Sequence, residues 1–291
     1  MMRLDGWLWL DDGMLLDAAG AMDGAGMREC RWMQTKGAGI VNPNRKTIRM
    51  EEMNWPDVRA AINEGYTTVV VGVGSMEQHG PHLPTMTDTR IGDAVAHAVA
   101  LRLGHALLAH TIPIGVSAHH LAFGATVSLR RETLKMIVRD YVDSLVRDGF
   151  TRIIFLPSHE GNFAPLAEAA GEARAAHPEI AIVACADLDE MSEMLDRVSG
   201  EFGVTPGEAG MHAGENETSL MLALEPELVV RERFAPGFLG KMEDKEIALV
   251  FEQGMPALTK NGVLGDPAKA SAEKGRIYLE KMIEYFVGLI G

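Results

Sequence analysis

The segment VGVGSMEQHGPHLPTMTDTRIGD (71–93) begins as an apolar run and then carries four side chains that could bind a metal ion: Glu77, His79, His82 and Asp88. If the chain is still extended at Glu77 and His79, their i, i+2 spacing points both side chains to one side. Carboxylates and imidazoles without thiolates suit Zn²⁺, Mn²⁺ or Fe²⁺ in a catalytic site rather than a structural one. An aspartate placed beyond such a pair can use both oxygens to bridge two ions.

Two later segments carry side chains of the same kinds. Taken singly, each candidate has an ordinary alternative, because a lone histidine usually finds a hydrogen-bond partner and an acidic residue near a helix start usually caps that helix. Three such clusters along one chain favour a metal site over these alternatives. The later candidates are His159 and Glu160 in PSHEGN (157–162), and His212, Glu215 and Glu217 in MHAGENETSLML (211–222).

Other catalytic motifs fit the chain poorly. GVGSMEQHG starts like a glycine-rich nucleotide-binding loop, but Glu77 stands where the third glycine of G-x-G-x-x-G belongs, and a carboxylate there would repel a pyrophosphate. The chain has no G-x-x-x-x-G-K-[ST], no G-x-S-x-G and no H-E-x-x-H. The motifs therefore argue against a dinucleotide enzyme and against a serine hydrolase.

Strands that alternate with helices must position these clusters. In the helix predicted between residues 129 and 149, apolar side chains such as Leu134, Val138 and Val142 form one stripe, and Gly149 suits a left-handed C-cap. The whole pattern predicts strands over 67–74, 106–115, 152–157 and 179–185, and further helices over 90–103, over 162–175, from 187 and at the C-terminus.

This order of elements predicts an α/β fold, in which a layered sheet of mostly parallel strands has helices on both faces. In such sheets, the loops that leave the C-terminal ends of the strands form a ligand-binding crevice. The loops after the strands at 67–74 and 152–157 carry the first two clusters, so we expect these clusters to meet there.

Composition limits the function classes. The 291 residues are 47% hydrophobic, and 41 acidic against 27 basic residues give a formal charge of −14, so nucleic acid is not an expected partner. Two separated cysteines indicate neither a disulfide framework nor a thiolate zinc site. Aspartates interrupt the apolar N-terminus, which fits neither a signal peptide nor a membrane span, so a cytoplasmic protein without a membrane partner is expected.

The domain boundary is predicted at residue 46. Residues 1–46 are rich in Gly and Met and lack a sustained period, which is typical of an appended arm, or of a segment that packs on a neighbouring subunit. Residues 47–291 form the predicted catalytic domain.

Five ordered segments resemble the creatininase (creatinine amidohydrolase) family. GSMEQHGPHLPTMTD is similar to the family's Glu-x-His-Gly-x-His-Leu-Pro stretch and the aspartate that follows it. The resemblance runs from about residue 47 to the C-terminus. The other four segments are SAHHLAFGATVSL (117–129), PSHEGN (157–162), HAGENETSLML (212–222) and GDPAKASAEKG (265–275).

The resemblance implies a creatininase-like α/β fold with two divalent metal ions per chain (Zn, Mn or Fe), assembled as a homo-oligomer, usually a hexamer. By position, Glu77, Asp88 and His159 would hold one ion, and His79 with the bridging Asp88 would hold the other. In the creatinine-hydrolysing members the remaining ligand is a carboxylate at the position that is Gly161 here. In members with glycine there, the glutamate of Glu-Thr-Ser takes this role, so the resemblance implies Glu217 as the remaining ligand, with Glu160 as the alternative.

The resemblance also assigns the substrate side of the site. His212 would be the catalytic acid and base, because a histidine can carry a proton both ways near neutral pH. Ser117, His120 and Glu160 would contact substrate. His82 would orient the loop between the ligands by a hydrogen bond.

These residues lead to a functional hypothesis. We expect a metal-dependent amidohydrolase that cleaves a C–N bond, other than a peptide bond, of a small polar cyclic or linear amide through a hydroxide bound to both metals. Creatinine itself is not the expected substrate, because all four tryptophans lie in the first 55 residues and the family's aromatic pocket walls come from the second half. The alternatives are a peptidase or lactonase on the same centre, or a non-catalytic homologue that keeps its metals.

Overall fold

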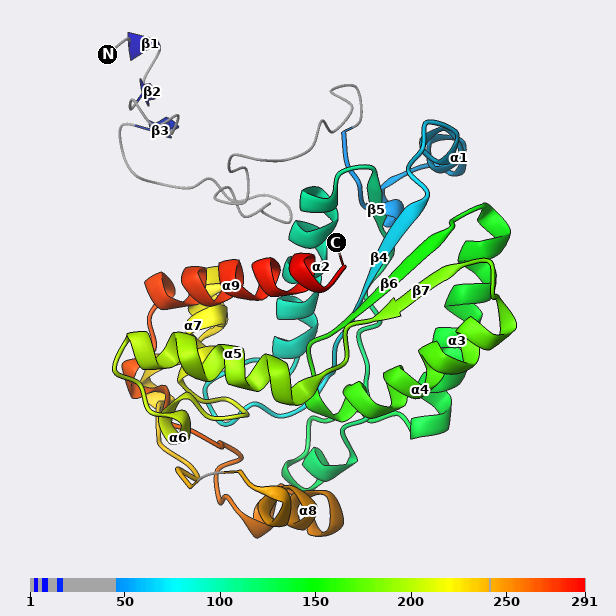
Figure 1. Cartoon of the computed structure of the whole chain (residues 1–291). Coiled ribbons are helices and arrows are strands. Elements are labelled where there is room, and N and C mark those ends of the chain that lie inside the picture. Colours follow the sequence, from blue (N-terminus) through cyan, green and yellow to red (C-terminus); the bar gives the residue numbers. More distant parts are fainter. Residues whose placement is uncertain (1–2, 5–6, 10–14, 18–45, 241, 291) are drawn as a thin grey trace. The chain divides into compact units, whose positions relative to one another are not determined.

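The computed structural model describes residues 3–4, 7–9, 15–17, 46–240 and 242–290 (Figure 1). The chain divides into two units, Met1–Thr35 and Lys36–Gly291. In the first unit, β1 (Arg3–Leu4), β2 (Trp7–Trp9) and β3 (Leu15–Asp17) form an antiparallel sheet. Most of the predicted extension lies outside the described residues, so the boundary at residue 46 stays a prediction.

The second unit is built on a parallel sheet in the order β5-β4-β6-β7. β4 (Thr68–Val73) and β6 (Arg152–Pro157) pair along their whole length. β7 (Ala181–Ala184) and β5 (Ala106–Leu108) flank them. Val69, Val70 and Val71 of β4 are fully buried, as their apolar run predicts for a strand covered on both faces.

The strand predicted over 106–115 is wrong in length, since β5 ends at Leu108. Beyond it, the amide of Ala109 donates to Val70 and the next bond to the same strand runs from Ile112 to Gly72, one residue later than a regular parallel ladder requires. The extra residue interrupts the pairing, as in a β-bulge, and Pro113 then lacks an amide donor.

Helices cover both faces of this sheet (Figure 1). α3 and α4 pack together on one face, while α2 and α9 pack together on the other, with α7 against α9. The predicted α/β class, parallel strands with helices on both faces, is confirmed.

The α-helices are α1 (Trp55–Asn63), α2 (Thr87–Leu103), α3 (Arg131–Asp148), α4 (Glu160–Ala176), α5 (Leu188–Glu201), α6 (Pro206–Ala209), α7 (Glu215–Leu224), α8 (Asp244–Gln253) and α9 (Ala272–Ile290). Short 3-10 helices are η2 (Met50–Glu52), η3 (Ala118–Phe123), η4 (Pro226–Leu228), η5 (Arg231–Arg233), η6 (Met255–Ala257) and η7 (Pro267–Lys269).

The ends of α2 and α3 agree in part with the sequence prediction, and the start of α2 places a candidate ligand. α3 follows its predicted stripe, with Leu134, Val138 and Val142 buried and Gly149 left-handed at φ 109°. α2 begins at Thr87, earlier than predicted, so Asp88 lies in its first turn, where a helix N-terminus favours a carboxylate.

Among the described residues, none of the helices has the length and apolar composition that a membrane crossing requires.

Candidate metal centre

Three chain segments bring carboxylates and imidazoles together at the C-terminal ends of β4 and β6. Glu77 and His79 follow β4, Asp88 lies in the first turn of α2, and His159 is the N-cap of α4. His159 Nδ1 lies 3.2 Å from Glu77 Oε2 and 3.3 Å from Asp88 Oδ2. All of these side chains are buried. Glu77, Asp88 and His159 form one group with the geometry to hold a metal ion, which is the first set predicted from the sequence.

A second group that could hold an ion consists of His79, His212 and Glu217. His79 Nε2 lies 3.0 Å from Asp88 Oδ1 and 3.7 Å from Glu217 Oε2. The structure therefore brings His79, Asp88 and Glu217 together, as predicted for the other ion, and adds His212. Asp88 faces both groups, one oxygen toward each.

Position 161 has no room for the carboxylate that the creatinine-hydrolysing relatives are expected to carry there. A Cβ on Gly161 would lie 2.1 Å from the Val116 carbonyl oxygen and 2.6 Å from His159 Nε2. A side chain at this position therefore requires the backbone around Val116 to move. This close approach favours Glu217 over position 161 as the source of the remaining carboxylate.

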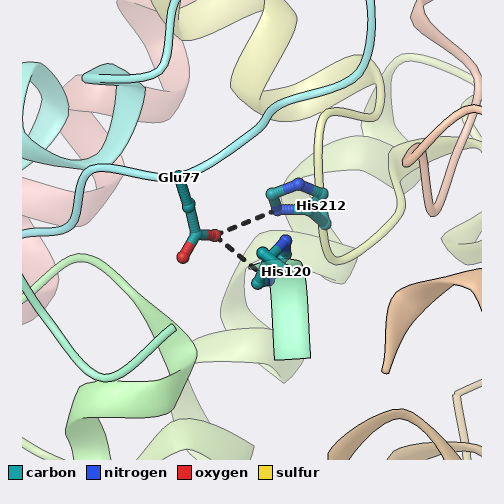
Figure 2. Close-up of side chains that lie close together, drawn as sticks. All are labelled: Glu77, His120 and His212. Atoms are coloured by element: carbon teal, nitrogen blue, oxygen red, sulfur yellow. Dashed lines mark ion pairs between the residues drawn. The ribbon is translucent and has the colours of Figure 1, made fainter. Parts of the chain in front are cut away.

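A third group was not predicted from the sequence. Glu77, His120 and His212 converge so that Glu77 Oε1 lies 3.2 Å from His120 Nε2 and 3.5 Å from His212 Nδ1 (Figure 2). The two imidazole rings lie beside one another, with centroids 4.4 Å apart. Glu77 therefore connects the metal-facing residues with two histidines on the other side of its carboxylate.

The hydrogen bonds of His79 and His159 leave one ring nitrogen of each free for a metal. His79 Nδ1 lies 3.1 Å from the backbone oxygen of Glu77, and His159 Nε2 lies 3.1 Å from that of Val116. A carbonyl oxygen only accepts, so these nitrogens carry the protons. The opposite nitrogens face the carboxylates, and once they lose their protons they offer lone pairs to a metal, as metal-binding histidines do.

The electrostatics of the cluster call for positive charge. Glu77 Oε1 and Asp88 Oδ2 are buried and have no hydrogen-bond partner. Burial lowers the pKa of His79, but the charges of Asp88 and Glu217 outweigh it and raise this pKa to about 10. The pKa of His159 is likewise raised despite burial, because Glu77 and Asp88 lie beside it. Buried carboxylates that hold protons on neighbouring imidazoles fit a site for divalent cations.

The predicted substrate-side residues lie around this cluster. Ser117 is buried, and its hydroxyl lies 3.2 Å from His159 Nε2 and 2.5 Å from the hydroxyl of Ser75. Glu160 is half-buried at the start of α4 and outside the metal-capable groups. Burial, with the charge of Glu217, raises the pKa of Glu160 to about 8. The pKa of His212 falls to about 3, because it is buried and near His79, so His212 is neutral at pH 7.

Sequence reasoning missed His119 and Gln78, which both contact the site. The ring of His119 lies parallel to that of His159, with centroids 5.9 Å apart, and the ring of Phe251 lies 4.6 Å from that of His119. The adjacent pair His119 and His120 was the available signal. Gln78 lies in the sequence between the candidate ligands Glu77 and His79, and its side chain contacts His120 and His212. No sequence pattern indicated this role.

The start of α7 is anchored to the same loop. His82 Nε2 lies 3.0 Å from the hydroxyl of Thr218, so His82 connects the segment after β4 to α7. The amide of Ala213 donates to Glu217 Oε2 at 2.6 Å, and Ala213 has a positive φ of 53°. A non-glycine residue with such a φ is uncommon, and here it directs the backbone between His212 and Glu217.

The fold and these clusters define an α/β protein with a buried centre suited to divalent metals. The chain belongs to the creatininase family, whose model, described as creatinine amidohydrolase, matches residues 51–290. The family resemblance read from the sequence is therefore confirmed.

Individual relatives differ in their described activities. A mycofactocin precursor peptide peptidase of Mycobacterium ulcerans is 33% identical over 233 residues, which cover 77% of this chain and 85% of that protein. A creatinine amidohydrolase of Pseudomonas putida is 28% identical over 251 residues, covering 82% and 94%. A solved structure described as creatininase with Mn has a TM-score of 0.71 and 26% identity, and covers 84% of this chain and 98% of that one. A mutant creatininase of similar likeness is described as of the Zn-Zn type.

Proposed function

We propose that this protein is a metal-dependent hydrolase of amide C–N bonds with a dinuclear centre. The observation that carries the proposal is the pair of buried carboxylates, Glu77 and Asp88, whose unpartnered oxygens lie among imidazoles that each turn a ring nitrogen toward them. Glu77, Asp88 and His159 would hold one ion, and His79, Asp88 and Glu217 the other. This donor set of carboxylates and imidazoles suits Zn²⁺ or Mn²⁺.

Bound divalent ions supply a nucleophile at neutral pH and polarise a carbonyl. The protein's own groups then complete the reaction. His212 is neutral at pH 7 and buried beside Glu77, so its Nδ1 can take a proton from the attacking water and pass it to the leaving nitrogen. Ser117, Glu160 and His120 lie around these groups and would orient the substrate.

The first substrate class is a small polar amide other than creatinine. A second candidate is the peptide bond of a short peptide, which the relatives described as peptide peptidases favour, since several are 33–34% identical to this chain. Both reactions break an amide C–N bond and need the same proton transfers. They differ in whether the site must accept a chain on both sides of that bond.

The test combines metal analysis with a substrate panel. Protein purified without chelators should carry about two ions per chain and should turn over at least one cyclic amide, formamide or short peptide. Mass spectrometry of the products separates the small-amide reaction from peptide cleavage. Turnover of lactones alone, or bound metal without turnover of any amide, would contradict the proposal and favour the lactonase or the non-catalytic homologue.

The homohexameric assembly and the cytoplasmic location stay predictions. Size-exclusion chromatography with light scattering measures the first, and fractionation of cells that produce the protein measures the second. The appended arm of residues 1–46 is tested in the same experiment, by comparing the full chain with a variant that begins at residue 47.

A further inference from the structure

Gln78 lies between the candidate ligands Glu77 and His79, and its side-chain amide has a fixed orientation. Its Oε1 accepts from the backbone amide of Gly80 at 2.9 Å. Its Nε2 donates to the carbonyl oxygen of Gly262 at 3.1 Å. If the oxygen and the nitrogen of this side-chain amide exchanged places, two acceptors would face each other at Gly262 and two donors at Gly80. Both hydrogen bonds would be lost, so the orientation is fixed.

This orientation decides which nitrogen of His120 carries the proton. Gln78 Nε2 lies 2.9 Å from His120 Nδ1, and because Gln78 is the donor, Nδ1 must be the acceptor. The proton of the neutral ring is therefore on Nε2. That nitrogen lies 3.2 Å from Glu77 Oε1 without forming a hydrogen bond to it, so the N–H of His120 stays available to the site (Figure 2).

The backbone of the same residue sets the same Nε2–H tautomer in His212, but there the opposite ring nitrogen faces Glu77. His212 Nε2 lies 2.7 Å from the backbone oxygen of Gln78, which can only accept, so Nε2 carries the proton. His212 Nδ1 then presents a lone pair, 3.5 Å from Glu77 Oε1. Both hydrogens of the Gln78 amide are already used by His120 and Gly262, so its 3.0 Å approach to His212 Nε2 is a contact without a hydrogen bond.

His120 therefore differs from the other three histidines of the centre. His79, His159 and His212 each donate one ring N–H to a backbone oxygen and turn toward the carboxylates the nitrogen that can lose its proton to bind a metal or to act as a base. His120 accepts on its outer nitrogen and turns an N–H inward. An imidazole that offers a hydrogen atom cannot ligate a metal through that nitrogen. The group Glu77, His120 and His212 is thus built to place a donor beside an acceptor.

We propose that Gln78 is a positioning residue that makes His120 the hydrogen-bond donor and His212 the proton acceptor of the reaction. The inference rests on the proposed amide hydrolysis. Water attacks the carbonyl carbon, a C–O bond forms, and the π electrons move to the carbonyl oxygen, to which His120 Nε2–H donates a hydrogen bond. His212 Nδ1 takes one proton of that water. When the C–N bond breaks, the carbonyl re-forms and His212 returns the proton to the leaving nitrogen.

The proton positions can be measured without a substrate. In the zinc-loaded full chain labelled with ¹⁵N-histidine, magic-angle-spinning NMR reports which nitrogen of each ring bears hydrogen, with loss of a signal in His120→Ala and His212→Ala giving the assignments. We expect the Nε2–H form for His120 and for His212. Gln78→Glu should convert His120 to the Nδ1–H form, because the new side-chain oxygen accepts where the amide donated. An Nδ1–H form of His120 in the unchanged protein would overturn the inference whether or not amides are hydrolysed.

Kinetics separate positioning from support of the loop. Gln78→Glu should lower kcat about 10²-fold, the range for loss of one donor to a developing oxyanion, with KM and metal content little changed. The matched variant Gln78→Met removes the amide without imposing the wrong proton position, so its loss should be smaller. In a His120→Ala background, Gln78→Glu should have almost no further effect, because both changes remove the same donor. If the two losses multiply, or if Gln78→Met is the worse variant, Gln78 only supports the loop.

Discussion

Two regions of this protein gather acidic side chains, and they satisfy those charges in different ways. Between α3 and α4, Glu168 and Glu172 lie at the surface and pair with basic side chains, as in the 2.7 Å contact of Glu172 with Lys135. At the centre, Glu77 and Asp88 are buried among imidazoles and each keeps an oxygen without a hydrogen-bond partner. The first region is complete as it stands, whereas the second calls for cations.

The difference shows how to separate a structural use of acidic residues from a functional one. Exposed ion pairs remain solvated, so each contributes little to stability. Burying carboxylates is costly unless they are paired with cations or hydrogen-bonded, so a cluster of them indicates a role beyond folding. The counts of acidic and basic residues alone do not make this distinction, because both regions contribute the same kinds of side chain.

Removing the shared carboxylate should have the largest effect. Asp88→Ala takes a ligand from both proposed ions, so metal content should fall from about two ions per chain to near zero. Turnover should fall by more than the roughly 10⁴-fold that general acid–base catalysis alone can supply. Metal analysis and steady-state kinetics measure the two losses. Full activity in Asp88→Ala would remove the basis for a dinuclear centre.

Removing the proton acceptor should have the next largest effect. His212→Ala leaves the carboxylates and the lone pairs of His79 and His159 in place, so metal content should be retained. The value of kcat should fall about 10²–10⁴-fold, because proton transfer from water and to the leaving nitrogen is lost. If His212→Ala instead lost its metals, His212 would be a ligand, as its place beside His79 and Glu217 allows.

Without metals, the stability of the protein should fall as the pH rises from 7 to 10. The pKa values of His79 and Glu160 are raised to about 10 and about 8, above their unfolded values of 6.5 and 4.5. The folded chain therefore holds protons that the unfolded chain has lost, and the stabilisation disappears as the pH passes the folded values. Each such proton changes the free energy of unfolding by up to about 1.4 kcal/mol per pH unit.

Melting temperatures across this pH range measure that slope. Chelator-treated protein should show the decline, and zinc-loaded protein should show a smaller one, because the ions replace the protons. Glu160→Gln removes one of the groups that titrate in this range and should flatten the curve of the metal-free protein near pH 8. A flat curve for the metal-free protein would contradict the raised pKa values.

A change in the surface region should have the smallest effect. Glu168→Ala removes contacts with Arg131 and Lys135, both of which face solvent or other acidic groups. The melting temperature should shift by less than about 4 °C, and metal content and kcat should not change. A loss of metal in this variant would mean that the two regions are not independent.

Local sequence patterns predicted the scaffold well, because each depends on neighbouring residues. The stripe of Leu134 and Val138 located α3, and the apolar run at 152–157 gave β6 with the same bounds. The short β5 was not predicted, because its end depends on a bulge against β4 rather than on its own residues. Strand order also predicted that the first two clusters would meet, since Glu77 and His159 leave adjacent parallel strands, while the set of Glu77, Asp88 and His159 was implied by the family resemblance.

The finer features of the centre depend on contacts that are distant in the sequence. His120 and His212 reach Glu77 from η3 and from the segment before α7, so their convergence required the folded chain. The role of Gln78 depends on a carbonyl oxygen at Gly262, 184 residues away. Residue type and spacing say nothing about which nitrogen of a histidine bears hydrogen.

The close approach at Gly161 also limits how such a centre can change over evolution. A Cβ there would collide with the carbonyl oxygen of Val116, so a single substitution cannot add a carboxylate at this position while the neighbouring segment stays in place. A chain that obtained its last ligand from α7 could move it to position 161 only after the backbone around Val116 had shifted. The two arrangements are separated by a backbone rearrangement, so a laboratory conversion would have to redesign both segments as a pair.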